Sequence, residues 1–357
     1  MATVRASIEV ALEPEAVFDA LVDELQLALA RSGIRLEARE GGRVLEGELL
    51  VGTVASWRPA ERIALVWSPA SWRPDETTEV ELRFDASAGG TTVTLEHRGW
   101  DRLVGEAGEV VGWFADQGLA PLLRAFSPRA FGDWVTDRRA RRPAGAQARG
   151  VYRDPLYHRP NFRVILEELA LTADDVLLEV GCGGGALLKD ALASGCRAAA
   201  VDHSADMVRL ASEANRAAVD AGRLTVREAS ADRLPFPDAS FTCATMTGVL
   251  GFLPDPVAAL AEIRRTLVPG GRFVGLGADP ELRGTPAAPE PMASRLRFYD
   301  GDGLAELARR AGFAEVRVVR RNLEPFAREV GVPEEHLPLF AGSGGGARFL
   351  LARAPRR

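Results

Sequence analysis

The chain has 357 residues, which suits two domains of ordinary size better than one hydrophobic core. Its 44 basic and 50 acidic residues give a net charge of −6, so neither a nucleic acid nor an anionic membrane is an expected partner. Three cysteines without ligand-like spacing, no basic and apolar leader, and no apolar run of ~18 residues predict a cytoplasmic protein with no metal site and no membrane span.

The first part of the chain alternates short apolar and polar segments with turns. Residues 3–12 alternate as a half-buried strand does, and Glu13-Pro14-Glu15 then begins a helix that Gly33 ends. Strand patterns follow over residues 34–40, 43–56, 61–67, 77–85 and 91–98, several of them separated by glycine or proline turns. These spacings are typical of an antiparallel meander.

A helical pattern covers Leu103 to Arg139, with breaks or kinks expected at Pro121 and Pro128. A strand, a helix, several antiparallel strands and a long closing helix predict an α+β domain over residues 1–139, in which a curved antiparallel sheet grips a helix.

This order of elements resembles the START-like helix-grip (SRPBCC) superfamily, nearest its branch of heat-shock-protein ATPase activator homologues. The segments that carry the resemblance are Ile8–Leu21, Leu95–Trp100 and Gly112-Trp113. The resemblance implies an apolar cavity between sheet and helix that could hold a hydrophobic small molecule. The tryptophans that could line such a cavity are Trp57, Trp67, Trp72 and Trp100.

Residues 140–150 are rich in Arg, Ala, Gly and Pro without apolar periodicity, which predicts a linker rather than an arginine-based binding site. A second domain is then expected over residues 151–357. Its first segment precedes the first strand and could fold over a ligand cleft, so Tyr152, Tyr157 and His158 are candidates for a lid. The other interpretation is that the tyrosines pack against the next helix and the histidine faces water.

The stretch from Asp174 to Asp202 predicts a strand, a glycine turn, a helix and a second strand that ends in an acid. The first strand carries one acid, Glu179, and the glycines follow within residues 181–185. Glycines at a strand-to-helix turn permit positive φ and let the backbone approach a ligand closely. An acid after the second strand can hold ribose hydroxyls, so this unit is predicted to bind a nucleoside-containing cofactor.

The identity of that cofactor is ambiguous from the glycines alone, because Gly181-x-Gly183-x-x-Ala186 also fits a dinucleotide fingerprint. Glu179 lies two residues before the first glycine, where it would repel a pyrophosphate. S-adenosyl-L-methionine has an ammonium and a sulfonium instead of a phosphate, so a buried acid at this point suits it.

Two further segments continue the pattern: Leu234–Phe241 (LPFPDASF) follows one βα unit downstream, and Leu267–Gly277 (LVPGGRFVGLG) leads into another strand. With the glycine loop and Asp202, they make residues 155–353 resemble the class I S-adenosylmethionine-dependent methyltransferases, which implies an α/β Rossmann-like sheet. The cofactor-binding residues expected from this resemblance are Glu179, Gly181, Cys182, Gly183, Gly185, Asp202, His203, Met207, Ser230, Ala231 and Met246.

Two positions depart from the family's pattern. Ser230 stands where the family usually has an acid beside the adenine, and Asp232, two residues on, is in question as a substitute. Thr242 stands where an acid commonly follows the phenylalanine of the fourth strand. The residues expected near the methyl-transfer point, after that strand, are Met246, Thr247, Leu250 and Phe252.

These features predict methyl transfer to a small-molecule acceptor, at oxygen or nitrogen for preference, with the first domain binding a hydrophobic ligand or presenting the acceptor. A general base is needed only where the acceptor must lose a proton, and Tyr157 and His158 are the candidates. One alternative is a non-catalytic binding protein with a degenerate methyltransferase half, which Ser230 and Thr242 motivate. Another is an NAD-dependent oxidoreductase, which Glu179 disfavours.

Overall fold

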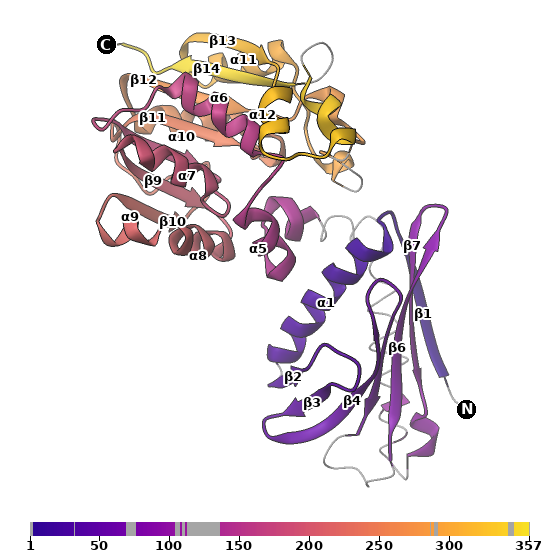
Figure 1. Ribbon diagram of the computed structural model, residues 1–357. Coiled ribbons are helices and arrows are strands. Elements are labelled where there is room, and N and C mark those ends of the chain that lie inside the picture. Colours follow the sequence, from indigo (N-terminus) through magenta and orange to yellow (C-terminus); the bar gives the residue numbers. More distant parts are fainter. Residues whose placement is uncertain are drawn as a thin grey trace. The chain divides into compact units, whose positions relative to one another are not determined.

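The computed structural model describes residues 3–31, 33–68, 76–103, 108, 111–112, 136–285, 287–288, 292–341 and 346–356. Contacts along the chain divide it into two compact units, Met1–Thr136 and Asp137–Arg357 (Figure 1). The domain boundaries drawn from the sequence, with a linker over residues 140–150, remain a proposal, but part of that linker is helical.

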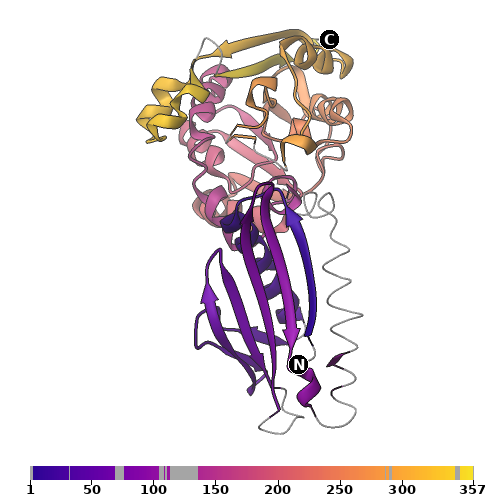
Figure 2. The same cartoon turned by 90° about the vertical axis from the view of Figure 1, so that its right-hand side faces the viewer.

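The first unit is an antiparallel sheet with one long helix, α1 (Pro14–Arg31), packed against it (Figure 2). Its described residues contain seven strands in the order β1-β7-β6-β5-β4-β3-β2. The strands are β1 (Thr3–Val10), β2 (Ile34–Leu36), β3 (Arg43–Glu46), β4 (Leu49–Arg58), β5 (Arg62–Trp67), β6 (Thr78–Ser87) and β7 (Gly90–Arg98).

The alternation read from the sequence builds the core of this unit. Val17 and Phe18 of α1 pack on Ile8 and Val93 of the sheet, and the ring of Phe18 meets Phe84 edge-on at 5.2 Å. The predicted α+β architecture is therefore confirmed.

The strand predicted over residues 43–56 is two strands in the structure. Gly47 adopts φ +60° and turns the chain back between β3 and β4. The helix predicted from Leu103 to Arg139 lies mostly outside the described residues.

The proposed tryptophan-lined cavity stays a prediction. Trp57 packs on the core beside Phe18, and Trp100 packs on Val4 and Ala6. Trp72 lies outside the described residues.

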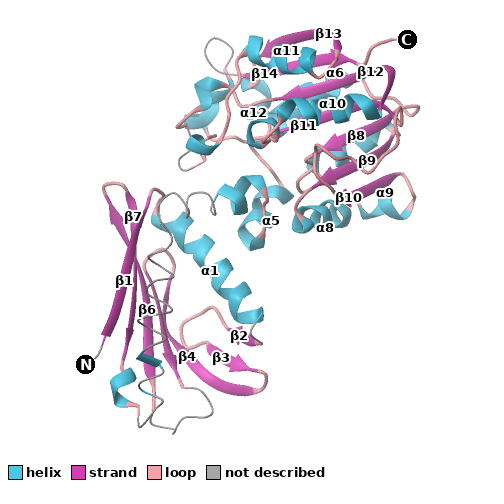
Figure 3. Ribbon diagram, turned by 180° about the vertical axis from the view of Figure 1, so that it is seen from behind, coloured by secondary structure: helices cyan, strands magenta, loops and turns pink. Residues whose placement is uncertain are grey.

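The second unit is a mixed sheet between two layers of helices (Figure 3). Seven strands of its described residues lie in the order β10-β9-β8-β11-β12-β14-β13. Among them, β14 alone runs in the opposite direction, between β12 and β13. They are β8 (Val176–Val180), β9 (Arg197–Asp202), β10 (Leu224–Glu228), β11 (Phe241–Thr247), β12 (Leu267–Leu276), β13 (Ala314–Arg321) and β14 (Ala347–Arg353). This arrangement confirms the predicted Rossmann-like sheet.

Helices cover both faces of this sheet because the apolar side chains of successive strand residues point to opposite faces. One face packs against α6 (Arg159–Leu169), α7 (Ala186–Ala191) and α12 (Glu324–Glu329). The other packs against α10 (Pro256–Thr266) and α11 (Gly301–Arg310). The other helices of this unit are α5 (Gly145–Arg153), α8 (Ala205–Ala214) and α9 (Arg216–Asp220).

None of the helices in the described ranges has the length and apolar character needed to cross a bilayer.

Thr242 lies at the beginning of β11, at the edge of the sheet opposite the carboxyl ends of the parallel strands. Its hydroxyl donates to Asp175 Oδ1 at 2.6 Å and accepts from the Val176 N–H at 3.0 Å. Arg272 donates to the same carboxylate oxygen at 2.8 Å. Ligands of such sheets bind at the other edge, so Thr242 is structural and gives no evidence of a decayed site.

We therefore expect Thr242→Val to lower the free energy of unfolding by about 1–3 kcal/mol, because it leaves the Val176 N–H without its acceptor. Urea unfolding of this variant measures the change. The matched control is Thr225→Val on the exposed part of β10, which should have little effect. An unfolding free energy equal to that of the unaltered protein would contradict the assigned role.

Candidate functional site

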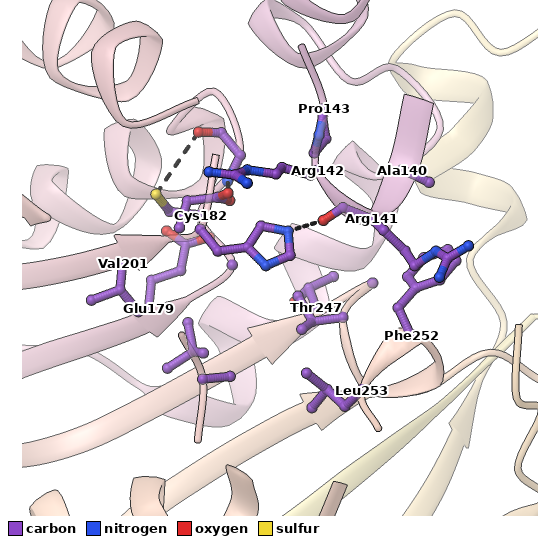
Figure 4. A pocket seen from close by; sticks show the side chains of 18 of the residues that line it. Ala140, Arg141, Arg142, Pro143, Glu179, Cys182, Val201, Thr247, Phe252 and Leu253 are labelled. Carbon is purple, nitrogen blue, oxygen red and sulfur yellow. Dashed lines mark hydrogen bonds between the residues drawn. The ribbon is translucent and has the colours of Figure 1, made fainter. Parts of the chain in front are cut away.

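A cavity of about 600 Å³ lies at the edge of the second sheet where β8, β9 and β11 end. The chain runs from β8 to β9 and β10 on one side and then crosses to β11 on the other, so the order of strands reverses beside β8. Crevices at such a reversal are the usual ligand sites of open α/β sheets. Figure 4 shows Glu179 and Cys182 on one side of this cavity and Thr247, Phe252 and Leu253 on another.

The glycine loop after β8 forms one wall of the cavity. Gly181 and Gly183 adopt φ of +77° and +50°, which side chains other than that of glycine rarely permit. The Gly181 N–H donates to the Val201 carbonyl at 2.8 Å, and the Gly183 N–H donates to Asp202 Oδ2 at 2.9 Å. A Cβ atom on Gly181 would lie 2.1 Å from the Val249 side chain, so the loop has no room for one.

Asp202 ends β9 and connects this loop to the next helix. While Oδ2 holds the Gly183 N–H, Oδ1 accepts from the Ser204 N–H at 2.9 Å. Ser204 is the residue that caps α8. The side chain is 8% exposed, and burial raises the pKa of its carboxyl group in spite of these hydrogen bonds.

Glu179 is the second acid of the cavity, on β8 beside the glycine loop. It is 4% exposed, and its Oε2 atom finds no hydrogen-bond partner in the part of the chain that the structure describes. Burial, and then the charge of Asp202, raises the pKa of this carboxyl well above its usual range. Burying a carboxylate without a partner costs free energy of folding, so a cationic ligand at this position would stabilise the protein.

A segment that we call the roof, residues 137–153, lies across the cavity and includes α5. The Arg141 carbonyl accepts a hydrogen bond from the His203 imidazole, and the Pro143 carbonyl accepts one from the Ser204 hydroxyl. The Arg149 guanidinium binds Asp206 at 2.9 Å. The roof includes the whole of residues 140–150, the segment predicted as a linker.

Tyr152 of the roof rests on the glycine loop. Cβ atoms built on Gly183 and Gly184 would lie 2.8 Å from its ring and 2.1 Å from its carbonyl oxygen. Burial, and then the charge of Asp202, raises the pKa of the Tyr152 phenol above its usual range. Of the three lid candidates, Tyr152 is the one that contacts the loop.

His158 lies at the other end of the cavity, where β11 ends. Its Cε1 atom is 3.7 Å from the position of a Cβ on Gly248. His158 is an exposed residue by its accessible surface, and the protein atoms packed near its ring lower the pKa of the imidazole. Thr247 lines the same region, and its Oγ1 atom has no hydrogen-bond partner among residues with a described placement.

Ser230 and Asp232 line the end of the cavity beside β10. The Ser230 hydroxyl donates to Asp232 Oδ1, which brings a carboxylate to the place where the sequence lacked one. The two side chains meet because the chain turns tightly through a bridge from Ser230 to Arg233. The reach of Asp232 to an adenine stays a prediction.

Most of the predicted site residues meet at this cavity. Those that line it are His158, Glu179, Gly181, Cys182, Gly183, Asp202, His203, Ser230 and Ala231. The roof residues Arg141, Arg142 and Pro143 also line it, although their segment was predicted to be a linker rather than an arginine-based binding site.

Four predicted residues lie elsewhere. Gly185 packs on α8, where a Cβ would lie 2.7 Å from the Asn215 amide. Met246 points to the opposite face of β11, into the core with Phe273, and Met207 is fully buried at the start of α8. Tyr157 donates to or accepts from His336 Nδ1 at 2.7 Å and stacks on Phe340, away from the cavity.

Comparisons with known proteins agree with this geometry. Residues 178–275 match a family model described as a methyltransferase domain. Residues 11–122 match a family model described as activator of Hsp90 ATPase homolog 1-like protein. The second unit therefore contains a methyltransferase domain of the S-adenosylmethionine-dependent class, and the first contains an activator-like domain, as both resemblances implied.

Individual relatives match only parts of the chain. An uncharacterized 37.1 kDa protein in transposon TN4556 of Streptomyces fradiae is 33% identical over 44% of this chain and 48% of its own length. An O-methyltransferase of Aspergillus sclerotiorum is 32% identical over 46% of this chain and 66% of its own length. The chain spans about half the length of the first curated relatives it matches. A solved methyltransferase from Aquifex aeolicus is 19% identical over 58% of this chain and 97% of that one, with a TM-score of 0.44.

The residues of the cavity fit S-adenosylmethionine. The unpartnered Oε2 of Glu179 suits the cofactor's ammonium, and the pair of acids would repel the phosphates of a dinucleotide. The bare glycine loop allows the close backbone approach that a nucleoside requires. When bound, this cofactor supplies an electrophilic methyl group on a sulfonium sulfur.

Gly181→Ala tests the loop. We expect it to destabilise the protein by more than the roughly 1–2 kcal/mol of positive φ alone, because the new methyl group meets Val249. The matched control is Gly222→Ala, where φ is +67° and nothing lies within 4 Å of the new Cβ. Thermal unfolding of both variants measures the difference, and equal losses would contradict the packing described here.

Glu179→Gln tests the buried charge. The folded state holds the Glu179 proton to a higher pH than the unfolded chain does, so this residue lowers stability as the pH rises above its unfolded pKa. Each pH unit between the two pKa values is worth about 1.4 kcal/mol. We expect the glutamine variant to be more stable than the unaltered protein at pH 7 and equal to it near pH 4, measured by urea unfolding. A variant less stable at pH 7 would show that the carboxylate is satisfied in the free protein.

Proposed function

We propose that the second unit binds S-adenosylmethionine in the cavity at the end of β8 and transfers its methyl group to a small-molecule acceptor. The observation that carries the proposal is the buried, unpartnered carboxylate of Glu179 beside a glycine loop and a second acid. A nucleoside ligand that also carries a positive charge fits the Glu179 carboxylate, the glycine loop and the second acid together.

Each part of the cavity has a role in this proposal. Glu179 binds the ammonium of the cofactor, and the remaining lone pairs of Asp202 bind the ribose hydroxyls. Asp232, held by Ser230, accepts from the exocyclic amine of adenine. The roof shields the bound cofactor from water, because Tyr152 rests on the loop from above.

The relatives support a small molecule as the acceptor. The Aspergillus sclerotiorum protein is an O-methyltransferase by name, which makes oxygen a reasonable acceptor atom for this chain. The first unit is proposed to bind a hydrophobic ligand or to present the acceptor, and the cytoplasm is proposed as the compartment.

The alternative of a non-catalytic binding protein loses its two motives. Thr242 is at the far edge of the sheet, and the contact between Asp232 and Ser230 supports the proposal that Asp232 supplies the acid that position 230 lacks. The alternative of an NAD-dependent oxidoreductase is disfavoured, because it would place the pyrophosphate of the cofactor against the carboxylate of Glu179, which repels it.

Isothermal titration calorimetry tests the proposal. We expect S-adenosylmethionine to bind and NAD not to bind. Asp202→Asn should weaken binding of the methyl donor by about 10-fold or more, because hydrogen bonds to a charged group are worth about 1.5–3 kcal/mol. Asp220→Asn, an exposed acid at the end of α9, is the control and should bind normally. Binding of NAD alone would overturn the proposal.

A further inference from the structure

The part of the cavity beyond the end of β11 has a mostly apolar lining. Phe162 of α6, Val249, Phe252 and Leu253 contribute side chains, with Pro155 and Pro254. In the proposed function this region receives the acceptor, because Val249 packs against Gly181 of the glycine loop. An apolar lining selects an acceptor with an apolar body.

The charged side chains of this region already have partners within the protein. Arg141 binds Asp137 at 2.9 Å, and Arg142 lies 3.5 Å from Glu228. Asp255 Oδ1 accepts from the Ala258 N–H at 2.9 Å and so caps α10. These pairs are largely exposed and each contributes little, so the preference for an acceptor without net charge rests on the apolar lining.

Two polar groups are left to face such an acceptor. The imidazole of His158 stands against Gly248. Thr247 lines the same space, and its buried hydroxyl has no hydrogen-bond partner from the described residues, so it is free to bond to an acceptor that packs against it. One group that can accept a proton and one hydroxyl that can orient an oxygen suit an alcohol, a phenol or an enol.

We propose that His158 is the general base of the reaction and that the acceptor is a neutral, largely apolar molecule with one hydroxyl group. This inference rests on the proposed methyl transfer and names its substrate class. The acceptor oxygen bonds to the methyl carbon while the bond from that carbon to sulfur breaks, and sulfur keeps the electron pair as a neutral thioether. The hydroxyl proton passes to the free nitrogen of the His158 imidazole, which becomes an imidazolium.

The state of His158 fits this task. The ring lines the cavity beside Gly248 and keeps accessible surface, so an acceptor can reach it. The protein atoms packed near it lower the pKa of the imidazole, which favours the neutral form that can take a proton. The other titratable groups that line the cavity are Asp137, Arg141, Arg142, Tyr152, Glu179, Cys182, Asp202, His203, Asp232 and Asp255. Tyr157, the neighbouring residue, faces His336 and is not placed to act as the base.

Binding can be tested without knowing the natural acceptor. The full chain has four histidines, so single substitutions assign their ring signals in NMR spectra. With S-adenosylhomocysteine bound, we expect 2-naphthol to shift the signals of His158. The charged analogue 2-naphthoate should bind at least 10-fold more weakly. Unmoved His158 signals, or tighter binding of 2-naphthoate, would overturn the inference.

Turnover supplies the second test, with transfer of labelled methyl to 2-naphthol as the measurement. His158→Asn should lower the rate by about 100-fold or more and leave cofactor affinity within about twofold. The unaltered protein's rate should rise with pH through the imidazole pKa and then level, whereas the variant's rate should keep rising as naphthol ionises. Tyr157→Phe is the matched control, which keeps the ring on Phe340 and should change neither rate nor profile.

The outcomes separate this inference from the proposed function. Failure of S-adenosylhomocysteine to bind in calorimetry would remove both. Normal cofactor binding without transfer to 2-naphthol would overturn the acceptor class alone. Transfer that persists in His158→Asn with an unchanged pH profile would overturn the role of His158 as the base.

Discussion

The carboxylate of Asp202 holds the cavity of the second unit together. One oxygen fixes the backbone of the glycine loop at Gly183, and the other fixes Ser204 at the start of α8. Burial, and then the charge of this carboxylate, raises the pKa of its neighbour Glu179, whose Oε2 atom has no hydrogen-bond partner in the described chain. The loop conformation therefore depends on one side chain, and the acidity of the cavity on the pair of acids, and both favour a cationic nucleoside as the ligand.

Much of this could be predicted from the sequence because the relevant signals are local. The glycines, the acid that ends β9 and the alternation of apolar residues predict a strand, a turn and a helix without any knowledge of distant contacts. These signals, with the family resemblance that they support, predicted a Rossmann-like sheet and the cofactor class, and most of the residues expected to bind the cofactor line the cavity. Met246 shows where such reasoning fails: it is next to a lining residue in sequence, but its side chain faces the other side of the strand.

The roof could not be predicted, for a physical reason. The hydrogen bonds at Arg141 and Pro143 are accepted by backbone carbonyls, which every residue type possesses, so they leave no pattern in the side chains. The contact between Asp232 and Ser230 was also hard to predict, because it depends on a tight turn rather than on spacing along a helix or strand. Tyr157 and His158 are adjacent in sequence, yet only tertiary contacts show that one binds His336 and the other lines the cavity.

The position of the roof also decides where the chain can be divided. A boundary placed at residue 151, which composition alone suggests, would produce an isolated C-terminal fragment without Arg141, Pro143 and Arg149. Such a fragment would keep every glycine and acid of the nucleoside site but would leave that site open to solvent on one side. A fragment that begins at Asp137, where the contacts divide the chain, retains the whole enclosure and is the form suited to expression, crystallisation and ligand screening.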